Sequence, residues 1–337
     1  MSDALNQYLS RDYDLTRHNT FGLSARSSFA RDVRDEAELP SLFTMADRAG
    51  LSVRLLGGGS NVILSENYAG ITAMMATSGL RQSDDGAGAT LIEAHAGESW
   101  HRLVAHAVGQ GLWGLENLAG IPGTVGAAVV QNIGAYGVEL SDRFVSLRAF
   151  DRSTRAFVEL AAPACRFAYR QSLFKQEKGR YVVTRVRLKV SRAGAPNLSY
   201  GNLSAIGDPD DPGQIMAEVL RLRARKLPDW RRCGNAGSFF HNPVVSDPEG
   251  RAFMLANPGA PAFSQADGWK LSAGWLIEQA GLKGYRRGRA GVSEQHALVL
   301  VNHGGATCSD ILDLADHVAT TVRHRFGISL QREPELL

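Results

Sequence analysis

The chain has 337 residues, enough for about two domains of typical size. Its hydrophobic fraction of 44% and charged fraction of 21% are ordinary for a globular protein and exclude a chain dominated by disorder. The formal net charge is only +3, and the 37 basic and 34 acidic residues are interspersed, which argues against a nucleic-acid partner.

Membrane insertion and secretion are also disfavoured. No run approaches the roughly 20 apolar residues of a membrane helix, and residues 1–15 lack a signal-peptide pattern. The three cysteines, Cys165, Cys233 and Cys308, are far apart and have no zinc-binding spacing. We therefore expect a cytoplasmic protein with free thiols and no bound metal.

Hydrophobic periodicity predicts a mixed α+β fold. The expected helices are 35–49, Glu98–Gly109, Gln214–Lys226, Ala273–Ala280 and Ser309–Arg325, the last with Ser309 as N-cap and Gly327 just beyond its end. The expected strands are Ser52–Leu56, Val62–Leu64, Phe144–Phe150, Tyr181–Val190 and a short closing strand, Ile328–Leu330. Residues 191–213 are rich in turn formers, which places a domain boundary near residue 190.

Two glycine-rich segments are candidates for binding a nucleotide. The first runs from Gly57 through Gly58, Gly59 and Ser60 to Asn61; consecutive N–H groups in such a turn can hold phosphate oxygens, although a tight hairpin would explain it as well. The second contains Ile121, Pro122, Gly123, Thr124, Gly126 and Ala127. It fits neither a Rossmann fingerprint nor a Walker A motif, and close helix packing on a sheet is the alternative explanation.

Other motifs are weaker when each is taken alone. Arg170, beside Tyr169, could bind a carboxylate, or it could be an ordinary surface arginine. Ser238 lies in a glycine-rich turn before two phenylalanines, where a hydroxyl can transfer a proton or simply hydrogen-bond. The basic residues at 223–226 could simply complement a helix C-terminus. His296 and the charged tail around Glu333 also have plain structural explanations.

Taken together and in this order, the motifs resemble the UDP-N-acetylenolpyruvoylglucosamine reductase (MurB) family. The segments that carry the resemblance are RHNTFG, LLGGGSNVIL, GLENLAGIPGTVGAAVVQNIGAYGVE, YRQSLFK, RKLPDW, GNAGSFFHNP, AGWLIEQAGLKGY and HALVLVN. They extend from about Thr16 to Glu333, which is nearly the whole chain.

The resemblance implies an FAD-binding domain of the vanillyl-alcohol-oxidase (PCMH) type over residues 1–190, in subdomains of about 1–75 and 76–190. A smaller α+β substrate-binding domain over 191–325 and a closing segment over 326–337 would follow. Both glycine-rich segments are then assigned to FAD. The implied reaction uses NADPH, through FAD, to reduce the enolpyruvyl group of a UDP-sugar in peptidoglycan synthesis. The enzyme is expected to be monomeric and to have no nucleic-acid or membrane partner.

The resemblance also assigns roles to individual residues. Arg170 would stabilise the substrate carboxylate and the developing enolate, Ser238 would donate a proton, and Glu333 would act with Arg170. Tyr200 matches a tyrosine of the type I subclass that closes over the UDP-sugar. Lys226 and Asn242 match nucleotide-binding residues, with Tyr169 and His296 as neighbours. Two departures are His241, where lysine is frequent, and Glu335, which competes with Glu333 in the alignment.

Two other functional classes stay open on the sequence. A related FAD oxidase that passes electrons to O₂ would share the flavin motifs without needing Ser238, Lys226 or Tyr200. A non-catalytic flavin or UDP-sugar binding protein would tolerate the loss of Arg170, Ser238 and Glu333.

Overall fold

The computed structural model describes residues 8–85, 88–265 and 268–337. Packing divides the chain into two compact units. Unit 1 comprises residues 1–13, 27–59 and 67–223, and unit 2 comprises residues 14–26, 60–66 and 224–337.

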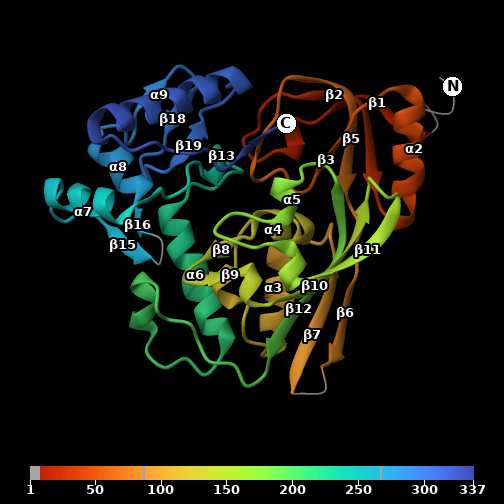
Figure 1. The fold of residues 1–337 in the computed structure, drawn as a ribbon, viewed down its shortest axis with the longest axis horizontal. Coiled ribbons are helices and arrows are strands. Elements are labelled where there is room, and N and C mark those ends of the chain that lie inside the picture. Colours follow the sequence, from red (N-terminus) through yellow and green to blue (C-terminus); the bar gives the residue numbers. More distant parts are fainter. Residues whose placement is uncertain (1–7, 86–87, 266–267) are drawn as a thin grey trace. The chain divides into compact units, whose positions relative to one another are not determined.

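Unit 1 contains a four-stranded sheet in the order β1-β2-β5-β3. Its strands are β1 (Ser10–Asp14), β2 (Arg26–Val33), β3 (Val53–Leu56) and β5 (Asn67–Met75). Helix α2 (Leu39–Ala49) packs on this sheet, as Figure 1 shows, because Leu42, Phe43 and Ala46 form one apolar stripe along it. The predicted helix over 35–49 is therefore present, but its first turn, Glu36–Glu38, is a 3₁₀ turn capped by Asp35.

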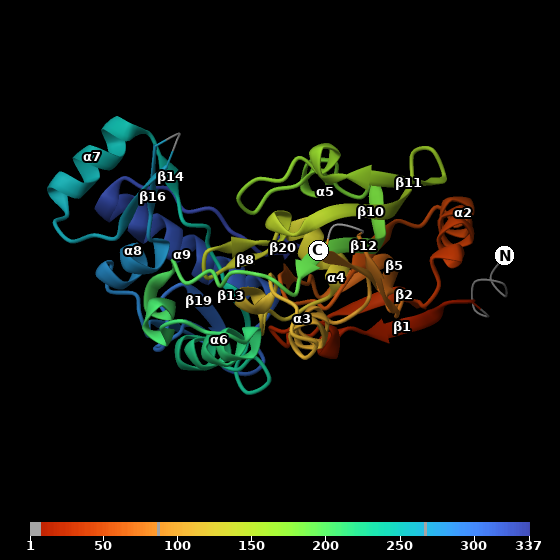
Figure 2. The ribbon, with the colours of Figure 1, turned by 90° about the horizontal axis from the view of Figure 1, so that it is seen from below.

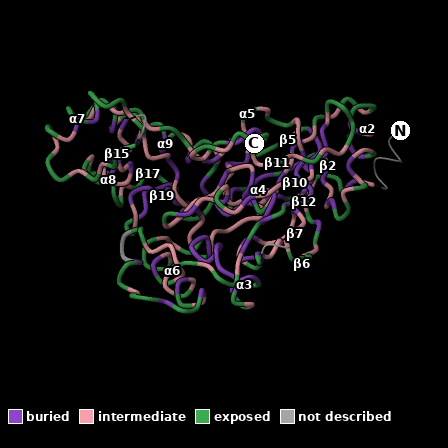
Figure 3. Tube along the Cα trace, turned by 60° about the horizontal axis from the view of Figure 1, so that its bottom comes forward, coloured by how far each residue is buried: buried purple, intermediate pink, exposed green. Residues whose placement is uncertain are grey.

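The second sheet of unit 1 has five strands in the order β11-β10-β12-β7-β6. These are β6 (Leu80–Asp84), β7 (Ala89–His95), β10 (Phe144–Asp151), β11 (Ala156–Ala161) and β12 (Tyr181–Ser191). All neighbouring pairs in it are antiparallel. Helices α3 (Trp100–Val108) and α4 (Val125–Gln131) bury their apolar faces with this sheet, and Figure 3 shows the buried segments along β10 and β12.

The remaining elements of unit 1 are short, apart from α6. They include the β8–β9 hairpin (Gly134–Ala135 and Val138–Glu139), α5 (Leu173–Gln176) and most of α6 (Pro212–Lys226), whose last three residues belong to unit 2. The boundary expected near residue 190 is not a break in packing, because Leu203, Ile215, Val219 and Leu222 are buried in the core of unit 1. By packing, residues 191–223 go with the first unit.

The described part of unit 2 combines three small sheets, one of them a pair of two-residue strands, with three helices that lie wholly within it. Its sheet β13-β19-β18-β17 uses Gly234–Ser238, Val299–Asn302, Ala290–Val292 and Arg286–Arg287, and its sheet β14-β16-β15 uses Val244–Val245, Gly268–Leu271 and Ala262–Gln265. The helices are α7 (Asp247–Ala256), α8 (Ala273–Gln279) and α9 (Cys308–Phe326). Figure 2 shows α8 and α9 beside β19, where they bury a common core.

Two predictions at the C-terminal end were wrong. Residues Ile328–Leu330 form no strand; the closing strand is β20 (Glu335–Leu336), which pairs in parallel with β4 (Val62–Ile63). The N-cap of α9 is Thr307 rather than Ser309, which lies two residues further along, because Thr307 and Asp310 form a reciprocal capping box. Gly327 ends α9 in the left-handed conformation, as expected.

Candidate active site

The two glycine-rich segments of the sequence meet in unit 1. A Cβ atom added to Gly58 would lie 2.6 Å from Cα of Gly123, and one added to Gly57 would lie 2.7 Å from Oγ1 of Thr124. Only glycine allows the two backbones to come this close. The hairpin explanation of the first segment fails, because β3 pairs in parallel with β5 and β4 pairs with β20 instead.

This meeting point has the polar group that a phosphate site needs. Oγ1 of Thr124 is buried and has no hydrogen-bond partner among the described residues. A buried hydroxyl without a partner is costly, so it is suited to a bound oxygen acceptor. Ile121 and Pro122 precede it and are partly exposed. The residues present therefore fit the phosphate-bearing cofactor that the sequence predicted.

The other small residues of the second segment have a packing role. A Cβ atom on Gly126 would lie 2.8 Å from Cβ of Ala96, and the Gly126 N–H donates to the Ala96 carbonyl at 2.9 Å. A Cβ atom on Gly57 would lie 3.1 Å from Cβ of Ala127. The packing explanation offered by the sequence therefore applies to Gly126.

Arg170 sits at the tip of a tight turn in unit 1. Ala168 and Gln171 exchange backbone hydrogen bonds of 3.1 and 2.9 Å across it, and Arg170 takes the left-handed conformation with φ 55°. Its guanidinium donates to the carbonyls of Gly134 at 2.7 Å and Asn132 at 3.4 Å and lies over the Tyr169 ring. Asn132 ends helix α4, which begins in the second glycine-rich segment, so α4 ties Arg170 to the predicted cofactor site.

Tyr200 belongs to the same unit and is 51% exposed. Its ring meets the edge of the Tyr136 ring at a centroid distance of 5.7 Å. Asn117, four residues before the second glycine-rich segment, donates to the Tyr136 carbonyl at 2.9 Å, which links this exposed tyrosine to the rest of unit 1.

In unit 2 the structure brings Ser238 and Glu333 onto neighbouring backbone segments. The N–H of Glu333 donates to the carbonyl of Phe239, and the N–H of His241 donates to the carbonyl of Gln331, both at 2.9 Å. Nε2 of His241 lies 3.9 Å from a carboxylate oxygen of Glu333, and both side chains are largely buried. Ser238 ends strand β13 after Gly237, whose φ is 71°.

Glu335, the alternative to Glu333, occupies a different place. Its backbone pairs with Val62 in strand β4, and its N–H donates to the carbonyl of Asn61 at 3.1 Å. Asn61, the last residue of the first glycine-rich segment, also donates from its side chain to the Glu333 carbonyl at 3.4 Å. The tail from Glu333 to Glu335 is therefore held beside that segment.

Two of the predicted substrate residues, Asn242 and His296, lie around the start of α8, and the charge of Lys226 acts on His296. Oδ1 of Asn242 accepts from the Ala273 N–H at 3.0 Å, and Nδ1 of His296 accepts from the Leu298 N–H at 3.2 Å. Burial lowers the pKa of His296, and the positive charge of nearby Lys226 lowers it further. Lys226 itself is exposed at the end of α6.

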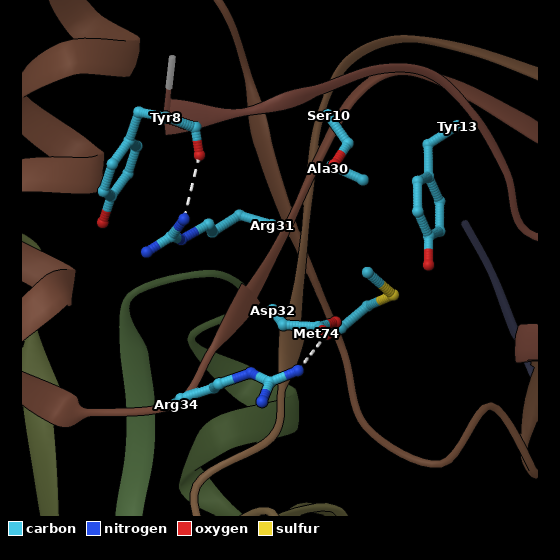
Figure 4. A pocket seen from close by; sticks show the side chains of 8 residues that line it. All are labelled: Tyr8, Ser10, Tyr13, Ala30, Arg31, Asp32, Arg34 and Met74. Atoms are coloured by element: carbon cyan, nitrogen blue, oxygen red, sulfur yellow. Dashed lines mark hydrogen bonds and ion pairs between the residues drawn. The ribbon is translucent and has the colours of Figure 1, made fainter. Parts of the chain in front are cut away.

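One hollow of the surface contains none of the predicted site residues. It has a volume of about 280 Å³ and lies among β1, β2 and β5, with Tyr8, Tyr13 and Arg34 on its wall (Figure 4). Arg31, on the same wall, is held by Glu38 and by the Tyr8 carbonyl at 3.1 Å. Among the described residues, no group of three or more His, Cys, Asp or Glu side chains could hold a metal ion, and no helix is long and apolar enough to cross a membrane.

Comparisons with known proteins identify the family. Residues 228–337 match the model of the UDP-N-acetylenolpyruvoylglucosamine reductase C-terminal domain, and residues 29–157 match an FAD-binding domain. The UDP-N-acetylenolpyruvoylglucosamine reductase of Cupriavidus pinatubonensis is 46% identical, over 96% of this chain and 98% of the relative. The chain belongs to the UDP-N-acetylenolpyruvoylglucosamine reductase family. The Pseudomonas aeruginosa member is 45% identical, over 96% of this chain and 97% of its own.

A solved structure of this family confirms the fold class. The crystal structure of UDP-N-acetylenolpyruvylglucosamine reductase (MurB) from Thermus caldophilus covers 98% of this chain and 99% of its own, with a TM-score of 0.68 and 27% identity. The α+β fold and the FAD cofactor expected from the sequence are thereby confirmed. The sequence assigned no role to His101, whose Nδ1 on helix α3 accepts from the Gly120 N–H at 3.1 Å, or to Asn117, which donates to the Tyr136 carbonyl at 2.9 Å.

Proposed function

We propose that this chain is an FAD-dependent reductase that uses NADPH to convert UDP-N-acetylglucosamine enolpyruvate into UDP-N-acetylmuramate, a precursor of peptidoglycan. Family membership over nearly the whole chain supports this activity. The observation that carries it is the backbone pairing that sets Glu333 beside the segment that begins with Ser238. An oxidase or a passive binding protein would need neither residue.

The residues that would hold FAD are those of the two glycine-rich segments, namely Gly57, Gly58, Gly59, Ser60, Asn61, Ile121, Pro122, Gly123, Thr124, Gly126 and Ala127. The close approach at Gly58 supports this assignment, as does the Thr124 hydroxyl, which has no hydrogen-bond partner in the described part of the chain. When bound, FAD supplies the two-electron chemistry that couples NADPH oxidation to reduction of the enolpyruvyl double bond.

Three residues of the chain would carry the acid–base and electrostatic work. Hydride addition to the terminal alkene carbon places negative charge toward the carboxylate, where the planar guanidinium of Arg170 can stabilise it. Ser238 Oγ would then give a proton to the other alkene carbon, which balances the addition. Serine is a weak acid, so this transfer requires a strongly basic carbon held close to it. Glu333 would act with Arg170 on the carboxylate.

Substrate binding is proposed for Tyr169, Tyr200, Lys226, Asn242 and His296. The exposed Tyr200 ring supports a role in covering the UDP-sugar. The exposed ammonium of Lys226 is suited to a diphosphate. Asn242 and His296 both lie around the start of α8. The functional domains would be 1–190 for FAD, 191–325 for substrate and 326–337 for Glu333. We also propose a cytoplasmic monomer, to be tested by cell fractionation and size-exclusion chromatography.

The test is NADPH consumption by the FAD-loaded protein without oxygen, with and without UDP-N-acetylglucosamine enolpyruvate. We expect stoichiometric oxidation only with this acceptor, and UDP-N-acetylmuramate as product. Reduction of the flavin with no transfer to the acceptor would refute the substrate assignment. Rapid aerobic turnover without the acceptor would favour an oxidase instead.

A further inference from the structure

Arg223 lies near the end of α6, in the basic stretch 223–226, where the sequence assigned a ligand-binding role to Lys226 but none to Arg223. Its side chain meets the second glycine-rich stretch: a Cβ atom on Gly120 would lie 3.2 Å from Arg223 Nε and 3.3 Å from its Cδ. Gly120 has φ 71°, so a side chain there would be strained as well as crowded. The arginine is therefore packed directly onto the loop that leads into Ile121 and Pro122.

The groups around Arg223 in unit 1 do not neutralise it. Its charge acts on the Tyr136 hydroxyl and on the imidazole of His101, whose Nδ1 accepts from the Gly120 N–H at 3.1 Å. Glu218, five residues earlier on α6, forms an ion pair with Arg221 at 2.5 Å. Within residues 8–85, 88–265 and 268–337, no carboxylate forms an ion pair with Arg223.

A cation in this position is costly unless something else supplies the negative charge. Burial lowers the pKa of Arg223, although guanidinium stays charged at any physiological pH. At the same time the residue keeps part of its surface accessible to solvent. A buried charge is normally paired, and its planar fork suits an oxyanion.

We infer that Arg223 binds an anionic group of the flavin nucleotide held by the Gly120–Pro122 loop. This group is either the diphosphate of FAD or the flavin ring, which carries a negative charge when it is reduced. The inference rests on the FAD site of the proposed function. It assigns to Arg223 a binding role that a helix-capping arginine would not have.

The test compares Arg223→Gln and Arg223→Lys with Arg225→Gln, which removes an exposed arginine two residues along the same helix. Apo-protein is titrated with FAD and with riboflavin, which lacks the diphosphate, and the midpoint potential of bound FAD is measured. None of these readouts uses the UDP-sugar, so failure of the proposed reductase activity leaves the test intact. Arg223→Met keeps the packing against Gly120 and is used if Arg223→Gln does not fold.

If Arg223 binds the diphosphate, we expect R223Q to bind FAD at least about tenfold more weakly and riboflavin as the wild type does, with partial recovery in R223K. If it pairs with the reduced flavin, affinity for oxidised FAD stays within a factor of about two. Each tenfold loss of affinity for the reduced form then lowers the two-electron potential by about 30 mV. Wild-type affinities and potential in R223Q and in R223M would overturn the inference.

Discussion

The N–H of Glu333 donates to the carbonyl of Phe239, the residue that follows Ser238, at 2.9 Å. These two residues are far apart in the chain, and the antiparallel pairing of the tail with residues 239–241 brings them into one unit. A hydrogen-bonded backbone changes little when one side chain is replaced. Ser238 and Glu333 can therefore each be tested by a separate substitution.

Replacement of Ser238 by alanine should abolish proton donation and leave the redox half-reaction intact. We expect FAD binding and flavin reduction by NADPH as in the wild type, and reduction of the enolpyruvyl substrate slowed by a factor of about 10² to 10⁴. Stopped-flow measurement of each half-reaction separates the two effects. Ser264→Ala, at an exposed position of β15, is the control. Normal product formation by S238A would exclude Ser238 as the proton donor.

Glutamine substitutions should distinguish Glu333 from Glu335. Glu333 lies beside Phe239 and His241, whereas Glu335 pairs with Val62 through its backbone, which a side-chain change leaves intact. We expect kcat to fall at least about 100-fold in E333Q and less than about threefold in E335Q, as for loss of an electrostatic contact in the transition state. A large loss in E335Q with an active E333Q would reverse the assignment.

Gly58→Ala should impair FAD binding. The new Cβ would meet the backbone of Gly123 at 2.6 Å, and a backbone neighbour cannot rotate away. The two glycine-rich segments must then separate, so we expect FAD affinity to fall at least about tenfold, measured by titration of the apo-protein.

Gly50→Ala is the matched control for that change. Gly50 ends α2 with φ 63° and has nothing within 4 Å of an added Cβ. Alanine there should lower the free energy of unfolding by about 1 kcal/mol through backbone strain, with FAD affinity unchanged. Equal loss of FAD affinity in both variants would show that general destabilisation, rather than the Gly58 contact, is responsible.

Because of His296, we expect the free energy of unfolding of the protein to decrease as the pH falls below about 6.5. Its pKa is lowered in the folded state by burial and by Lys226, so the unfolded chain takes up a proton first. The unfolding free energy therefore falls with decreasing pH below the unfolded pKa, by at most about 1.4 kcal/mol per pH unit from this residue, until the folded pKa is reached.

Urea unfolding at pH 7.5 and 5.5 measures this effect. His296→Asn keeps an acceptor for the Leu298 N–H and should show a smaller loss of stability between the two pH values. Lys226→Met should also reduce the loss, because removal of the nearby positive charge raises the pKa of His296. An equal loss in the wild type and in H296N would contradict the assignment.

Much of the secondary structure could be predicted because it depends on local patterns. The stripe of α2 and the alternation in β12 follow from the periods of helix and strand, and the structure contains both. The closing strand was misplaced because β20 is only two residues long and exists through its pairing with β4, near residue 62. The N-cap of α9 was misplaced by two residues because several candidates for a cap stood together.

The sequence by itself determined the family, the cofactor class and the residue types suited to the chemistry, because motif order and glycine spacing are properties of the chain. Only the tertiary structure decided that Gly58 meets Gly123, that Glu333 rather than Glu335 lies beside Phe239, and that Arg223 lies against Gly120. Such contacts join residues separated by tens to hundreds of positions. Their presence depends on how sheets and helices pack, and no local pattern records it.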